Sequence, residues 1–319
     1  MKKKKRRRSY TPVVLLSALL SASVAAGSLY LAGRVQPEIH ELTETRENEP
    51  TLSLWDEPEA YAASLDSAVE DGVQPEEKCF DYDELLSEEE GLHIYRIHGK
   101  DYRGVLAVVD DPKRLYVATL DYYGEYGLTL EQFIERKNAI LATNGGGFDD
   151  PNGEGNGGTP TGIVMVDGQY RWGGKYGEYD CLAITADGRL ITGRRTGEYL
   201  ESQNTLYAVS YGPGLIVDGE IQELYVSQPE PRTAVGQREN GEMLLLIVEG
   251  RQVGALGVDL PTLARIMAEL GCVNATNLDG GASSALFYRG TLMNRPNGLA
   301  GMRPMPSALM MNASGEVAE

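Results

Sequence analysis

The sequence predicts an α+β fold, with a mixed β-sheet core and a few flanking helices in a single domain behind an N-terminal membrane anchor. Three observations lead to this prediction. Short runs rich in Val, Ile and Tyr alternate with turn residues from about residue 91 onward, which is typical of strands. Two passages there have the order strand–helix–strand, which favours a mixed sheet. A basic cluster followed by a long uncharged run at the start of the chain indicates the anchor.

Residues 1–34 are expected to form a cytoplasmic basic tail and a transmembrane helix. Lys and Arg fill positions 2–8, and 25 uncharged residues follow from Ser9 to Gly33. A helix of that length measures roughly 37 Å, against about 30 Å for the hydrocarbon core of a bilayer. The positive-inside rule then places residues 34–319 outside the cytoplasm, as the extracellular part of a single-pass membrane protein. A signal peptide cleaved near residues 23–25 is the alternative, and it would give a secreted protein.

Residues 35–90 are expected to form an acidic stem or linker. The segment holds 19 acidic residues against Arg46 and Lys78, a net charge of −17. Such a charge density favours an extended, solvated chain. The folded domain is therefore expected at residues 91–319, a length sufficient to bury one core.

The first elements of this domain follow from local signals. Strands are expected at 93–97, 105–109 and 115–120. Thr129 is suited to cap a helix that ends near Asn138, and a buried strand at 139–143 follows it.

The later elements are separated by clearer turns. Further strands are expected at 162–166, 181–185, 189–192 and 215–217, with Asp-Gly turns at 167–168, 187–188 and 218–219. The continuous apolar run 243–248 indicates a central strand. A second helix is expected at 261–270, between Asp259 as N-cap and Gly271 as C-cap, and it is followed by a strand at 275–278.

Composition excludes several classes of protein. Without its first 34 residues the chain has a net charge of −26, so nucleic acid is not expected as a partner. The three cysteines show no CxxC spacing, which argues against a disulfide scaffold or a structural zinc site. No histidine follows His98, so a histidine-dependent triad or metal site in the later part of the chain is not expected.

Two sequence motifs resemble known ligand-binding patterns, but each lacks a required feature. Gly153, Gly155 and Gly158 match a dinucleotide fingerprint, but the residues after them predict a strand instead of the required helix. The alternating oxygen donors from Asp150 to Asn156 resemble a calcium loop without its terminal glutamate. A plain Gly/Asn loop is favoured, with Ca²⁺ kept as the alternative and no cofactor expected to be required.

Polar residues stand at the ends of apolar strands in three segments, beside glycines. They lie at 144–149, at 231–236 with 249–251 beyond it, and at 277–284. Strand ends present catalytic side chains, and glycine lets a ligand approach the backbone. Each segment alone is compatible with a structural turn, but the three together indicate one site.

These segments resemble the phosphodiester glycosidase family over roughly residues 102–312. The resemblance rests on NGGGF at 144–148, PRTAVG at 231–236, VEGRQ at 248–252, NLDGGASS at 277–284, Asn294, and Arg303 to Leu309. Two positions depart from the family pattern, because Gly147 stands where an aromatic is usual and Glu249 where Asp is usual. The resemblance implies hydrolysis of the C1–O bond of a sugar-1-phosphodiester, in an envelope or extracellular glycan.

Cleavage of a sugar C1–O bond passes through an oxocarbenium-like state that two carboxylates normally stabilise. We therefore expect Asp279 as nucleophile or base and Glu249 as its partner. Arg232 is suited to bind the phosphate through two hydrogen bonds. The backbone N–H groups of 145–147 and 280–281 are expected to form an anion nest. The full set of expected substrate-binding residues is Asn144, Gly145, Gly146, Arg232, Thr233, Arg251, Asn277, Gly280, Gly281, Ser283 and Ser284.

Two other functions stay open at this point. One is a non-catalytic glycan-binding domain that uses the same cleft. The other is a phosphodiesterase that cuts the P–O bond with a metal ion held by carboxylates.

Overall fold

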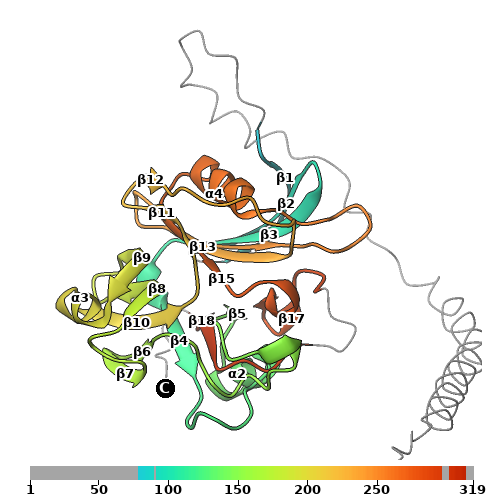
Figure 1. The fold of residues 1–319 in the computed structure, drawn as a ribbon. Helices are drawn as coiled ribbons and strands as arrows, with labels where there is room; N and C mark the ends of the chain where they lie inside the picture. The colour runs from blue at the N-terminus through green and yellow to red at the C-terminus, as the bar shows by residue number, and fades with distance from the viewer. Residues whose placement is uncertain (1–77, 90, 297–301, 314–319) are drawn as a thin grey trace, which may run out of the picture. The chain divides into compact units, whose positions relative to one another are not determined.

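The computed structural model describes residues 78–89, 91–296 and 302–313, which form three β-sheets with helices on their outer sides (Figure 1). The predicted anchor at 1–34 and most of the predicted linker lie outside the described residues. Within the described part of the chain, no helix is both long and apolar enough to cross a membrane.

The largest sheet has eight strands in the order β1-β2-β3-β14-β13-β15-β11-β12. Its strands are β1 Asp81–Glu89, β2 Leu92–Gly99, β3 Tyr102–Val109, β11 Gly214–Val217, β12 Glu220–Ile221, β13 Arg232–Arg238, β14 Met243–Val248 and β15 Cys272–Leu278. The central strand β14 was predicted with these same bounds. It is buried throughout because β3 and β13 flank it and both sheet faces are covered.

The two smaller sheets have five strands each. The first has the order β7-β6-β10-β8-β9, with β6 Val164–Val166, β7 Gln169–Trp172, β8 Glu178–Thr185, β9 Leu190–Thr196 and β10 Thr205–Ser210. The second has the order β17-β16-β5-β18-β4, with β4 Leu115–Thr119, β5 Leu141–Asn144, β16 Leu286–Tyr288, β17 Thr291–Leu292 and β18 Ser307–Met311. One core cluster contains side chains from all three sheets, including Val235, Ile184 and Leu309. The three sheets therefore enclose a shared core.

Both predicted helices are present with their caps. The helices are α2 Leu130–Lys137, α3 Gly197–Ser202 and α4 Leu260–Glu269, and single 3₁₀ turns occupy Pro112–Arg114, Pro151–Gly153 and Gly281–Ser283. Thr129 and Gln132 form a reciprocal capping box at the start of α2. The Asp259 carboxylate accepts a hydrogen bond from the Thr262 N–H at 2.9 Å at the start of α4.

The prediction of a mixed sheet is wrong for the described strands, since every ladder among them is antiparallel. The two strand–helix–strand passages do join strands that run in the same direction. However, β13 lies between β14 and β15, and β18 lies between β4 and β5. Each inserted strand runs antiparallel to both of its neighbours, so no parallel pair forms.

The folded part also begins before the predicted boundary at residue 91. Residues 81–89, assigned to the linker, form strand β1, which pairs with β2 along its length. The Glu89 carboxylate at its end accepts hydrogen bonds from the Tyr288 hydroxyl and the Arg289 guanidinium, both at 2.7 Å. These contacts and the half-buried positions along the strand stabilise it despite its acidic composition.

Helix α4 covers the outer face of the eight-stranded sheet (Figure 1), where its apolar side packs on β13 and β15. Gly236 of β13 marks the closest approach. A Cβ at this position would lie 2.6 Å from both the Cys272 Sγ and the Met267 Cε atoms. The glycine therefore leaves the space that these two side chains fill.

Replacing Gly236 with alanine is expected to lower the free energy of unfolding by about 1–3 kcal/mol, because overpacking forces the neighbouring side chains apart. Turnover per folded molecule should stay the same. Gly174→Ala is the matched control, since a Cβ at Gly174 would have no neighbour within 4 Å. Chemical denaturation of both variants measures the difference, and equal stability of the two would contradict this account of the packing.

Candidate active site

Four of the predicted site residues lie at the same end of adjacent strands. Arg232 begins β13 and pairs with Val248, after which β14 ends and Glu249 follows. Thr233 pairs with Leu278, after which β15 ends and Asp279 follows. Because β13 runs antiparallel to both neighbours, its first residues lie beside the last residues of β14 and β15. The predicted strand-end residues are thus brought to one edge.

The carboxylate of Asp279 lies at this edge in a desolvated position. It is partly open to solvent, yet desolvation by the surrounding protein raises its pKa. A hydrogen bond of 3.0 Å from the Gly280 N–H and the nearby Ser283 hydroxyl and Arg303 guanidinium oppose this rise, while the Asp150 carboxylate adds to it. A carboxylate held in this way is suited to act as a nucleophile or a base.

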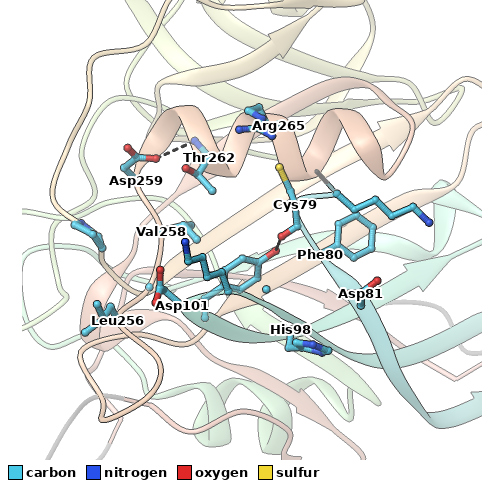
Figure 2. Close-up of a pocket in the computed structure, with 16 residues that line it drawn as sticks. Cys79, Phe80, Asp81, His98, Asp101, Leu256, Val258, Asp259, Thr262 and Arg265 are labelled. Atoms are coloured by element: carbon cyan, nitrogen blue, oxygen red, sulfur yellow. Dashed lines mark hydrogen bonds between the residues drawn. The ribbon is translucent and has the colours of Figure 1, made fainter. Parts of the chain in front are cut away.

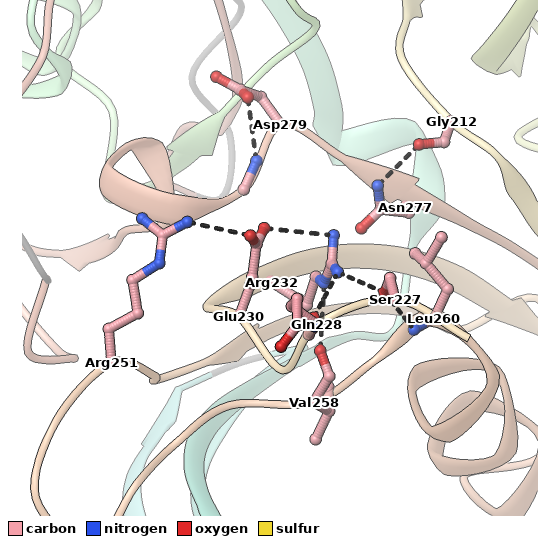
Figure 3. A network of polar contacts seen from close by, with 11 residues as sticks. Gly212, Ser227, Gln228, Glu230, Arg232, Arg251, Val258, Leu260, Asn277 and Asp279 are labelled. Carbon is pink, nitrogen blue, oxygen red and sulfur yellow. Dashed lines mark hydrogen bonds and ion pairs between the residues drawn. The ribbon is translucent and has the colours of Figure 1, made fainter. Parts of the chain in front are cut away.

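Two arginines lie on either side of the turn that follows Asp279. A Cβ at Gly280 would lie 4.0 Å from the Arg232 Cδ atom, and one at Gly281 would lie 3.5 Å from the Arg251 Nη1 atom. Figure 3 shows Glu230 between the two guanidinium groups, with ion pairs of 3.9 Å to Arg232 and 3.2 Å to Arg251. The Asp279 turn is therefore bordered by two cations that share one acid.

Arg232 is held firmly by the protein. Its Nε donates to the Val258 carbonyl at 3.2 Å, and its Nη2 donates to the Ser227 hydroxyl at 2.9 Å. Arg232 is only 9% exposed. With a further bond of 3.4 Å from Nη2 to the Gln228 carbonyl, these contacts fix the guanidinium in one orientation and occupy both Nε and Nη2. Nη1 is the nitrogen left to face a phosphate, so the predicted bidentate contact is not available in this arrangement.

Asn144, at the end of β5, connects this edge to the second five-stranded sheet. Its Nδ2 donates to the Asp279 carbonyl at 2.7 Å, and its Oδ1 accepts from the Thr233 hydroxyl at 2.9 Å. The residue is 1% exposed. The structure therefore gives Asn144 and Thr233 the role of positioning the Asp279 backbone, whereas the sequence assigned them to substrate binding.

The predicted anion nest is wrong, because protein groups already occupy its N–H donors. Gly145 and Gly146 donate to the carbonyl and the hydroxyl of Ser307, and Gly147 donates to the Ser210 carbonyl. Gly280 donates to the Asp279 side chain and Gly281 to the Pro231 carbonyl.

The glycines at 145–147 instead allow the close approach of other segments. A Cβ on Gly145 would lie 2.5 Å from the Ser307 Oγ, and one on Gly146 would lie 2.7 Å from the Ser210 carbonyl oxygen. At Gly147 it would lie 2.7 Å from the ring of Tyr211. The run of glycines is thus explained by packing.

Glu249, the predicted partner of Asp279, is buried and accepts a hydrogen bond of 2.6 Å from the Arg295 N–H. Among the described residues, no hydrogen bond or ion pair joins Glu249 to Asp279 or to Arg232. Its observed contact fixes the segment at Arg295.

Two polar atoms near Asp279 are buried and have no partner among the described residues. The Nδ2 of Asn277 donates to the Gly212 carbonyl at 2.7 Å, but its Oδ1 is unpaired, as is the hydroxyl of Ser284. Unpaired buried polar atoms cost free energy unless water or a ligand binds them. These atoms are suited to meet the hydroxyls of a bound sugar.

The sequence did not identify Glu230, Tyr211 or the pair of Arg303 and Asp150 as parts of the site. Glu230 and Tyr211 lie in segments without a recognisable pattern, so no local signal marks them. Arg303 donates to both carboxylate oxygens of Asp150, at 2.8 and 2.7 Å, and lies over the Phe148 ring. The ion pair therefore engages the carboxylate of Asp150, which is the first residue of the calcium-like pattern.

Strand β6 follows the glycines of the dinucleotide-like pattern, where a helix would be needed to bind a pyrophosphate. Within the described ranges, no group of three or more His, Cys, Asp or Glu side chains is placed to hold a metal ion.

A hollow of about 790 Å³ lies on the outer face of the eight-stranded sheet, beside the start of α4 (Figure 2). None of the predicted site residues lines it. Its wall includes Val258, whose carbonyl accepts the hydrogen bond from Arg232. The hollow therefore adjoins the segment that holds the Arg232 guanidinium.

Comparisons with known proteins identify relatives of this domain. A family model described as phosphodiester glycosidase matches residues 137–311, more than half of the chain. A prophage-derived uncharacterized protein of Bacillus subtilis is 26% identical over 189 residues, which cover 55% of this chain and 28% of that protein. The N-acetylglucosamine-1-phosphodiester alpha-N-acetylglucosaminidase of Bos taurus is 31% identical over 189 residues, covering 53% of this chain and 35% of the enzyme.

The fold has a counterpart among solved structures. The catalytic domain of the zebrafish N-acetylglucosamine-1-phosphodiester alpha-N-acetylglucosaminidase, auto-inhibited by its pro-peptide, superposes with a TM-score of 0.56 at 21% identity. The match covers 75% of this chain and 85% of that domain. At this identity the superposition establishes a shared fold, and the chain spans about a third of the length of the two curated relatives.

Proposed function

The chain belongs to the phosphodiester glycosidase family, and on this basis we propose that it hydrolyses the C1–O bond of a sugar-1-phosphodiester. The observation that carries the proposal is the turn at Asp279, where a carboxylate with a raised pKa is bordered by Arg232 and Arg251. A carboxylate beside two guanidinium groups matches a substrate whose reacting carbon carries a phosphate.

In the proposed reaction, Asp279 acts on the sugar side of the bond. As an ionised carboxylate it either attacks C1 or removes a proton from the attacking water, and both routes stabilise a developing oxocarbenium ion. The departing phosphate monoester is a weak base, so charge stabilisation is more important than proton donation. Arg232 and Arg251 supply that stabilisation, and Glu230 holds them together.

The substrate class follows from the same groups. The bovine relative is named for N-acetylglucosamine-1-phosphodiesters, and we propose an envelope or extracellular glycan with a sugar-1-phosphate linkage as the substrate here. The location outside the cytoplasm rests on the basic cluster and uncharged run at residues 2–33 alone. The reaction requires no cofactor in this scheme.

Hydrolysis in ¹⁸O-labelled water identifies the bond that breaks. With an N-acetylglucosamine-1-phosphodiester as substrate, the label is expected on the anomeric hydroxyl of the released sugar, and the phosphate monoester should remain unlabelled. Mass spectrometry of both products makes this measurement, and Asp279→Asn serves as the inactive control.

Two results would contradict the proposal and select an alternative. Label in the phosphate, together with loss of turnover in EDTA, would indicate a metal-dependent phosphodiesterase. Binding of the diester without turnover would indicate a glycan-binding domain.

A further inference from the structure

A group of exposed aromatic side chains lies on the loop after β4 and on strand β7. Tyr122 is 85% exposed and Tyr126 is 79% exposed, and both belong to the loop at 121–127. Trp172, the last residue of β7, is 37% exposed, and its ring meets the half-buried ring of Tyr123 at a centroid distance of 5.4 Å. We refer to these four side chains together as the aromatic surface.

The loop that carries the three tyrosines is held against the rest of the domain. The Gly124 N–H donates to the Gly158 carbonyl at 2.8 Å. The Tyr123 hydroxyl lies 2.7 Å from the Thr119 hydroxyl, which donates to the Pro306 carbonyl at 2.9 Å. Aromatic rings on a backbone fixed in this way lose little conformational freedom when a ligand binds to them.

Residues 157–164 connect the two parts of the aromatic surface. At the start of this segment Gly157 pairs with Tyr126, and at its end Val164 pairs with Trp172. The tyrosine loop and β7 therefore border the same segment.

The middle of that segment lies beside the residues that follow β5. The Thr161 N–H donates to the Gly147 carbonyl at 2.9 Å, and the Asp149 N–H donates to the Thr159 carbonyl at 2.9 Å. Gly157 and Thr161 are four residues apart in sequence, a distance of about 14 Å at most. Since Thr161 is also exposed, a ligand that extends from the candidate active site by several sugar units can reach the aromatic surface.

The rings and the local charge together select the class of ligand. Exposed apolar side chains that gather in one place on a protein commonly mark a binding site. The face of an aromatic ring carries partial negative charge, so it attracts the C–H groups of a pyranose, while tyrosine hydroxyls can bond to the hydroxyls of the sugar. The charged residues of the tyrosine loop and β7 are Asp121, Glu125 and Arg171. Their net charge is negative, which disfavours an anionic ligand.

We propose that the aromatic surface binds uncharged sugar residues of an oligosaccharide and so holds the glycan part of the substrate beside the candidate active site. The role in substrate recognition rests on the proposed function, whereas the binding of sugar does not. The substrate is then a sugar-1-phosphodiester within a chain of sugars, with its phosphate near Arg232 and its neutral residues on the rings.

Trp172 itself reports the binding. The chain has two tryptophans, so Trp55→Phe leaves Trp172 as the only one. The full-length Trp55→Phe protein is titrated with tetramers of N-acetylglucosamine, of glucose and of mannose. At least one tetramer is expected to change the Trp172 fluorescence saturably, because a stacked sugar excludes water from the ring. No change with all three would overturn the proposal.

Replacing both Tyr122 and Tyr126 with alanine in this background should weaken the binding about tenfold, since two stacking rings are lost. Tyr225→Ala is the matched control, because Tyr225 is 73% exposed but lies on the loop between β12 and β13. It should leave the binding unchanged. An equal loss in the control would show that the sugar does not bind at the aromatic surface.

Kinetics separate the binding of sugar from its role in recognition. For a diester of N-acetylglucosamine-1-phosphate that carries the bound tetramer, the double alanine variant should raise KM about tenfold and leave kcat unchanged. For the methyl diester, which lacks the tetramer, both constants should stay the same. An unchanged KM for the longer diester would overturn the role in substrate recognition.

The two proposals fail in different ways. Saturable binding of a tetramer without hydrolysis of either diester would mean that the proposed function is wrong and that the aromatic surface stands. Hydrolysis of both diesters, with no binding of any tetramer and no kinetic effect of the double variant, would overturn the aromatic surface and leave the proposed function intact.

Discussion

Asp279→Asn is expected to reduce kcat by about three or more orders of magnitude and, at neutral pH, to make the protein more stable. The isosteric amide keeps the shape of the side chain but cannot act as a nucleophile or a base. The gain in stability follows from the raised pKa of the carboxyl group in the folded state. At pH values above this pKa, the folded protein contains a desolvated charge that the amide removes.

The gain in stability of Asp279→Asn depends on pH. Because the folded-state pKa lies above the unfolded value, the charge costs nothing below the unfolded pKa and its cost grows as the pH rises toward the folded pKa. The Tm difference between Asp279→Asn and wild type should therefore be largest at neutral pH and vanish in acid. Thermal unfolding from pH 3 to pH 8, with kcat measured in parallel, tests both parts.

Asp187→Asn is the control with the opposite sign. Thr185 and Arg189 lower the pKa of the Asp187 carboxyl, so its ionised form stabilises the fold above the unfolded pKa and this stability is lost as the pH falls. That variant should lose stability at neutral pH and keep full turnover. If Asp279→Asn were instead less stable at pH 7 and retained turnover, Asp279 would be a structural residue of the Gly280 turn.

Arg232→Lys is expected to lower kcat/KM on the order of a hundredfold, although the charge is conserved. A lysine ammonium group has its donors on one nitrogen and lacks the planar Nε and Nη2 pair with which the guanidinium contacts the Val258 carbonyl and the Ser227 hydroxyl. The cation therefore loses its fixed orientation toward the phosphate. Kinetics with a sugar-1-phosphodiester and the inhibition constant of inorganic phosphate measure the two consequences, and both should change together.

Arg238→Lys provides the comparison, since Arg238 lies at the other end of the same strand. It is also partly buried, with its Nε on the Leu270 carbonyl at 2.8 Å and an ion pair of 2.7 Å to Glu242. Its replacement should affect stability but leave kcat/KM and phosphate inhibition unchanged. Equal kinetic losses in the two variants would mean that Arg232 acts only through the fold.

Elements with local signals were predicted accurately from the sequence. Helix α2 begins with a capping box between Thr129 and Gln132, and α4 begins after the Asp259 cap. Both signals involve residues within the first turn of their own helix. Strand β14 is recognisable because six consecutive apolar residues require cover on both faces. Strands β10, β16 and β18 carry no comparable signal and were not predicted.

Pairing between distant segments could not be predicted. The insertion of β13 between β14 and β15 makes the ladder antiparallel, and no local pattern encodes it. The anion nest failed for the same reason, because Ser307 and Ser210 supply the partners of the glycine N–H groups from far along the chain. Arg232 and Asp279 were predicted as site residues because polar residues at strand ends, in segments that also contain glycine, are a local signal of a site. Glu230 and Tyr211 reach that site only through the fold.

The position of β18 also determines when this domain can fold during synthesis. Ser307 and Gly146, which β18 and the end of β5 bring together, are 161 residues apart in sequence. Contacts of such long range slow folding, because the chain between them must be ordered first. Until Met311 has left the ribosome, β4 and β5 present open edges that other chains can pair with. Chaperones that bind unpaired strands should therefore stay with the nascent chain until its last described strand is made.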